Sequence, residues 1–143
     1  MSEEREAYLI RLSEQLVPLI WEATPVALSA PERVFIAVWQ LEADVNNGGF
    51  HQYYFNPAGD LALDTPAALE AIGASRTAEI VRSANSIFPS GPPRDRYARQ
   101  TVLEAISDDA FSHLDESFFA NEDDLSSLLY SYVQAHRQSI RGT

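Results

Sequence analysis

The sequence predicts an all-helical fold, with six or seven helices in a single compact domain. Apolar residues recur at intervals of three and four along most of the chain, which is the helical period. No segment alternates apolar and polar residues long enough to indicate a strand. Capping residues, prolines and glycines mark helix starts and ends at short intervals. The 143 residues are a normal length for one domain, which we assign to residues 1–143.

Two helices are expected in the first part of the chain. Residues 3–23 carry one apolar stripe, and Pro18 should kink this helix or split it in two. Ser29 and Glu32 form a capping box that opens a second helix, which should run to about Val45. The first stripe consists of Leu9, Leu12, Leu16 and Ile20.

An unusual corner follows, with the sequence Asn-Asn-Gly-Gly at residues 46–49. Glycine has no Cβ and tolerates positive φ, so a helix should end here and a short aromatic helix should begin at Phe50. Asn56, which precedes a proline, should end that second helix. Glu42 falls on the apolar face of the preceding helix, and our interpretation is that it accepts hydrogen bonds from the turn. The predicted structural motif comprises Glu42, Asn46, Asn47, Gly48, Gly49, Phe50, Tyr53 and Phe55.

Further helices are expected in the second half, separated by turn signals. Ser75 is the expected cap of one of them, and the Pro-Gly-rich residues 89–93 form the clearest loop. The expected helices are Asp64 to Gly73, Ser75 to Phe88, Arg94 to Ile106 and Glu122 to Ile140.

Charge narrows the range of partners. The formal net charge is −11, with 21 acidic residues, ten arginines and no lysine. Such a field disfavours direct binding to nucleic acid or an anionic membrane and favours a basic protein partner. Positive charge is concentrated at residues 76–99, where Arg94, Arg96 and Arg99 suggest a basic band.

An acidic segment follows at residues 108–128, where three seven-residue rows each begin with two acids and place an apolar residue fourth. In a helix, successive pairs would lie about 10 Å apart, which approaches the charge density of a DNA strand with a phosphate every ~3.4 Å. The alternative interpretation is a solvated face above an apolar stripe. The candidate partner-binding acids are Asp108, Asp109, Asp115, Glu116, Glu122, Asp123 and Asp124.

Catalytic motifs are missing from the sequence. The chain has no cysteine and three histidines, and it carries neither a nucleophile elbow nor a phosphate-binding glycine loop. We therefore expect no enzymatic activity, cofactor or metal. The alternative is a small enzyme or ligand-binding domain with a pocket at the corner, formed by Glu42, Asn47, His51 and Tyr54.

Three stretches resemble a bacterial family of helical proteins, mostly uncharacterised and best known for a DNA-mimic member. They are Val45 to Asn56, Ala71 to Ala74, and Gly91 to Arg99. The similarity extends from about residue 29, so residues 29–143 form the family-like core and residues 1–28 an N-terminal helix region. The resemblance implies a homodimer whose acidic surface occupies the DNA site of a helix-turn-helix transcription regulator, with the Asn-Gly-Gly-Phe motif as a fold determinant.

The sequence carries no export or membrane signal. No run of about 18 apolar residues occurs, and the first residues are acidic and polar, unlike a signal peptide. We expect a cytoplasmic protein.

Overall fold

The computed structural model describes residues 1–143 and contains seven α-helices, three short 3-10 helices and no strand, which confirms the all-helical prediction. The α-helices are α1 (Glu3–Ile20), α2 (Ala30–Phe55), α3 (Thr65–Ala71), α4 (Ser75–Ile87), α5 (Arg96–Glu104), α6 (Ser112–Phe119) and α7 (Leu125–Ala135). The 3-10 helices are η1 (Pro57–Leu61), η2 (Asp108–Phe111) and η3 (Arg137–Ser139).

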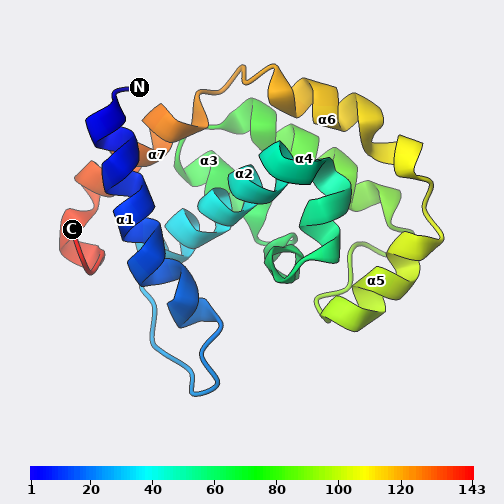
Figure 1. Cartoon of the computed structure of the whole chain (residues 1–143), viewed down its shortest axis with the longest axis horizontal. Coiled ribbons are helices and arrows are strands. Elements are labelled where there is room, and N and C mark those ends of the chain that lie inside the picture. The colour runs from blue at the N-terminus through cyan, green and yellow to red at the C-terminus, as the bar shows by residue number, and fades with distance from the viewer.

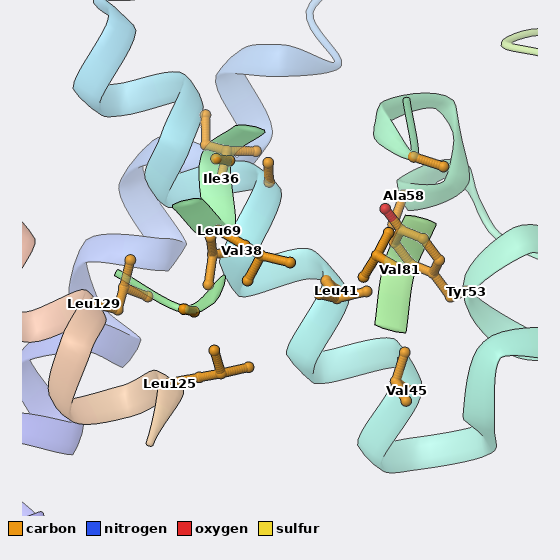
Figure 2. Packing of buried hydrophobic residues seen from close by; sticks show 14 of the residues in the cluster. Ile36, Val38, Leu41, Val45, Tyr53, Ala58, Leu69, Val81, Leu125 and Leu129 are labelled. Carbon is orange, nitrogen blue, oxygen red and sulfur yellow. The ribbon is translucent and has the colours of Figure 1, made fainter. Parts of the chain in front are cut away.

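Helix α2 is the centre of the fold. It crosses the middle of the molecule (Figure 1) and contacts every other α-helix, reaching α4 through the Tyr54 side chain, which bonds to Asn85. A single core of 29 buried apolar residues surrounds it. Figure 2 shows Ile36 and Val38 of α2 near Leu69 of α3, with Leu125 and Leu129 of α7 in the same cluster. The later helices therefore depend on α2 for their apolar contacts.

The glycine corner divides α2 into two helical parts, as predicted. Gly48 has φ −156° and ψ 20°, and Gly49 has φ 73° and ψ −175°. Only Gly49 adopts a positive φ at the corner. The first part continues past Val45 up to the glycines, and the second ends at Phe55. The corner thus redirects the chain so that Phe50 begins a new helical direction.

Three helix boundaries differ from the predictions. Helix α1 is one helix that ends two residues after Pro18, so the proline lies in the last turn and does not split it. Ser75 lies inside α4, whose N-cap is Ala74. Helix α7 ends at Ala135 and is followed by η3, so it is shorter than the periodicity indicated.

The C-terminal segment closes against the start of α2. The predicted capping box is present, with the Ser29 hydroxyl accepting from the Glu32 N–H and the Glu32 carboxylate accepting from the Ser29 N–H. The same carboxylate also accepts from the Arg141 guanidinium, at 2.7 Å. Ser29 donates its hydroxyl to the Ser139 carbonyl. Figure 1 shows the C-terminus beside α1.

A structural corner and an exposed acidic edge

The carboxylate that holds the glycine corner belongs to Asp115 of α6. The Phe50 backbone N–H donates to Asp115 Oδ1 at 2.8 Å. A Cβ at Gly49 would lie 2.7 Å from Asp115 Oδ2, so the close approach of this carboxylate requires glycine. The prediction that Glu42 holds the turn is wrong: its carboxylate accepts from the Ser126 hydroxyl of α7, at 3.5 Å. Glu42 thus faces α7, while α6 supplies the carboxylate at the corner.

The polar side chains of the corner bond to one another. Asp44 accepts from the side-chain amides of Gln52 and Asn56, at 3.1 Å and 3.2 Å. Asn47 donates to the Gln52 side-chain carbonyl at 3.1 Å, whereas Asn46 is exposed. The amides therefore link the two parts of α2 across the kink, which is a structural role.

Aromatic rings fill the space beneath the corner. Phe50, Tyr53 and Tyr54 are fully buried. The Tyr53 hydroxyl bonds to Thr65 at 2.9 Å, and the Tyr54 hydroxyl donates to Asn85 at 2.6 Å. Burial raises the pKa of both phenols above the ordinary value of 10, so both stay protonated at neutral pH.

The four residues of the alternative pocket do not converge. Glu42 faces α7, the Tyr54 hydroxyl points into the core toward Asn85, and His51 lies 3.6 Å from Asp108 at the surface. The rings beneath the corner form a packed cluster with Phe111 and Phe118. The geometry does not favour a ligand site at this corner.

A fully buried arginine holds the far end of α2. Arg99 donates to the backbone carbonyls that end α2, from Tyr54 at 2.6 Å and Asn56 at 2.8 Å. It also pairs with Asp60 at 2.8 Å and bonds the Pro93 and Arg94 carbonyls. A Cβ at Gly59 would lie 2.6 Å from Arg99 Nε, so glycine is needed there for the guanidinium to fit.

The predicted basic band is therefore not a free surface. Arg99 is 0% exposed, Arg94 pairs with Asp64 at 2.8 Å, and Arg96 donates to the Phe55 carbonyl. Five of the ten arginines pair with carboxylates, and together they engage six of the 21 acidic residues. Fifteen carboxylates consequently have no arginine partner.

The three acidic rows do not form one continuous helix. They fall on η2 and α6, then on a turn at Asn121, which has φ 50°, and finally on α7. Asp123 accepts from the Thr77 N–H at 2.8 Å and from its hydroxyl at 3.0 Å, so it satisfies the start of α4 in place of Ser75. Asp124 caps α7 through Ser127.

The predicted partner-binding acids thus divide into two groups. Asp115 and Asp123 are engaged with the backbone of other helices, and Glu122 pairs with Arg76. The remaining four are exposed and have no arginine partner: Asp108, Asp109, Glu116 and Asp124.

The start of α1 extends this exposed acidic surface. Figure 1 shows η2, α6, the connection to α7 and the first turns of α7 and α1 along one long edge of the molecule. Met1 Sδ lies 3.9 Å from the Ser127 hydroxyl, which places the two helix starts together. We define the acidic edge as Glu3, Glu4, Glu6, Asp108, Asp109, Glu116 and Asp124. The sequence alone gave no sign that residues 3–6 join it, because the two segments are more than 100 residues apart.

The fold and its surface define a small, acidic, all-helical protein with a solid structural corner and an edge of exposed carboxylates. The chain belongs to the DMP19-like protein family, whose model matches residues 26–136. This is a family of DNA-mimic proteins. No curated protein and no solved structure gave a significant match. No helix is both long and apolar enough to cross a membrane.

Proposed function

We propose that this chain is a DNA mimic, an acidic module that occupies the DNA-binding surface of a basic protein such as a helix-turn-helix transcription regulator. The observation that carries the proposal is the acidic edge, seven exposed carboxylates without an arginine partner. Membership of the DMP19-like family supports it. The role is binding without catalysis, by a homodimer in the cytoplasm.

The chemistry of recognition follows from the charges. Lysine and arginine side chains that neutralise DNA phosphates also pair with carboxylates, and complementary potentials accelerate encounter. The arginines of this chain interfere little, because half of them are already paired. Exposed charges are screened by salt, so affinity for the partner should fall steeply as ionic strength rises.

The binding footprint is narrower than the acidic sequence segment. Asp115 and Asp123 already accept hydrogen bonds from backbone N–H groups, and reversing their charge would disturb the corner and the start of α4. We therefore place the footprint on the acidic edge. Asp108, Asp109 and Glu116 are its most suitable probes, because they are exposed and do not cap a regular α-helix.

The proposal is tested by affinity capture from a bacterial lysate, with elution by duplex DNA. We expect duplex DNA to release a basic DNA-binding protein. Retention of every captured protein in the presence of excess DNA would contradict DNA mimicry.

A charge-matched pair of variants then tests the footprint. The triple variant Asp108→Asn, Asp109→Asn, Glu116→Gln should lose partner binding while its circular dichroism stays unchanged. The control Glu14→Gln, Glu22→Gln, Glu104→Gln removes the same charge outside the acidic edge and should bind nearly as well as the wild type. Equal losses in the two variants would show that net charge, and not the acidic edge, determines binding.

A further inference from the structure

A small cavity lies between α1, α2 and α7, at the α1 end of the acidic edge. Its volume is about 150 Å³. Small-molecule sites usually measure about 300–1,000 Å³, so this cavity suits one long side chain better than a separate ligand. Its lining consists of Glu6, Leu9, Ile10, Trp39, Glu42 and Ser126.

Three of the six lining residues, Leu9, Ile10 and Trp39, form an apolar wall. Leu9 is buried, and Ile10 is 47% exposed at the rim. The Trp39 ring stacks on Phe35 with a centroid distance of 5.9 Å and an interplanar angle of 11°. Long basic side chains lay their methylene stems along such surfaces, and tryptophan is the most favourable ring for a cation.

Glu42 is the half-buried carboxylate of this cavity, and it has no cation. None of the ion pairs of the molecule includes it, and its single hydrogen bond, from the Ser126 hydroxyl, is 3.5 Å long. Arg5, on the same turn of α1 as Glu6, is held over the Tyr130 ring at 4.8 Å. A carboxylate in this position lacks the partner that would offset its desolvation.

The acidic residues around Glu42 destabilise its charged form further. Burial is the main cause that raises the pKa of Glu42; the Ser126 hydrogen bond opposes it, and the negative charges of Asp124 and Glu6 raise it further. An entering ammonium or guanidinium group would therefore meet the Glu6 and Glu42 carboxylates and the Ser126 hydroxyl, with the negative charge of Asp124 nearby. An entering carboxylate or a neutral apolar group would not be stabilised in the same way.

We propose that this cavity is an anchor pocket for one lysine or arginine side chain of the partner, with the stem against Leu9, Ile10 and Trp39 and the charged head at Glu42. The inference rests on the proposed function, which supplies a basic partner. The pocket would add a specific contact to the electrostatic attraction, because a DNA backbone offers phosphates but no carboxylate at the end of an apolar pocket.

The pocket is tested without the partner by NMR titration with two matched probes, Nα-acetyl-lysine amide and Nα-acetyl-norleucine amide. The lysine probe should shift the Trp39 indole N–H and the Ser126 amide signals, and the norleucine probe should not. In Glu42→Gln the lysine response should weaken by at least about tenfold, because a charge-assisted contact is lost, while Glu14→Gln should behave as the wild type. Equal responses to both probes, or no response at these signals, would overturn the anchor pocket.

The captured partner separates this inference from DNA mimicry. Glu42→Gln should bind the partner at least about tenfold more weakly than Glu14→Gln, which has the same net charge. If duplex DNA releases the partner but both variants bind equally, the anchor pocket is wrong and mimicry stands. If the lysine probe binds at Trp39 but DNA never releases the partner, mimicry fails and the pocket stands. Circular dichroism of Glu42→Gln establishes that either result concerns a folded protein.

Discussion

Asp115 accepts a hydrogen bond from the Phe50 backbone N–H at 2.8 Å, across 65 positions of sequence. This contact joins α6 to the kink of α2, and it satisfies a donor that the non-helical glycines leave without a helical acceptor. Asp115, which the sequence placed among the surface acids, therefore stabilises the contact between α6 and α2. Mutations can separate this structural role of an acid from the proposed role of the acidic edge in binding.

Removing that carboxylate should cost stability. Asp115→Ala leaves the Phe50 N–H without its acceptor, and the expected loss in the free energy of unfolding is about 1–3 kcal/mol. Urea denaturation followed by circular dichroism measures it. The neighbouring Glu116→Ala is the control, because Glu116 is exposed, and it should stay within about 0.5 kcal/mol of the wild type. Equal losses at the two positions would contradict the structural role of Asp115.

Gly49→Ala should be more damaging than a substitution at another glycine of positive φ. Both Gly49 (φ 73°) and Gly73 (φ 89°) disfavour a side chain, at a cost above about 1 kcal/mol. Only at Gly49 would the new Cβ also press on Asp115, at 2.7 Å; at Gly73 the nearest atom is 3.9 Å away. We expect a lower melting temperature for Gly49→Ala than for Gly73→Ala. A similar decrease for both would mean that backbone strain alone operates.

Arg99→Met should destabilise the fold strongly. The substitution removes the Arg99 hydrogen bonds to four backbone carbonyls and to the half-buried Asp60 carboxylate. Breaking a fully buried pair by removing one partner costs about 3–5 kcal/mol, and the partial exposure of Asp60 places the expected loss toward the lower end. Thermal and urea denaturation should both show it. The control is Arg11→Met on the exposed side of α1, for which little change is expected.

The Glu32–Arg141 pair should contribute to stability in a pH-dependent way. Burial alone would raise the pKa of Glu32, but hydrogen bonds from Arg141 and Ser29 lower it to about 2. Because the folded pKa lies below the usual value of 4.5, the contribution is complete above about pH 4.5 and is lost as pH falls toward 2. Urea denaturation at several pH values should show Glu32→Gln less stable than the wild type near neutrality, with the difference shrinking in acid. A difference that is constant with pH would contradict this assignment.

Glu42 should have the opposite pH dependence. Burial raises its pKa in the folded state, so its contribution is greatest below the unfolded value and is lost as pH rises through the folded value. Glu42→Gln should therefore gain stability relative to the wild type as the pH rises above the usual glutamate value of 4.5. Parallel denaturation series of the two proteins measure this, and a gain that is largest in acid would contradict it.

The fold was predictable because its signals are local. The capping box at Ser29 and Glu32 and the glycines at the corner act within a few residues. Apolar spacing located the remaining helices except α6, which lies in the acidic segment and was not predicted as a separate helix. Boundaries were less accurate where a tertiary contact replaced the local signal, as at α4, where Asp123 bonds the Thr77 N–H from 46 residues away.

The roles of individual charges were much harder to predict. Glu42 is near the corner in sequence, yet α2 directs it toward Ser126 on α7, while Asp115 reaches the corner from α6. Arg99 is one of several arginines in its segment, and its burial depends on carbonyls from separate turns that meet only in the folded chain. Gly59, which lies beside the guanidinium, is the one sequence feature that relates to the burial of Arg99. A single glycine, however, does not show which side chain approaches it.

The contact of Arg141 with Glu32 has a consequence for the order of folding. It joins residues 109 positions apart, and closing so long a loop carries an entropic cost that local helix contacts do not. We expect such a contact to form after the transition state, once α2 and its neighbours have assembled. We therefore expect the C-terminal contact to slow unfolding and to leave the rate of folding nearly unchanged.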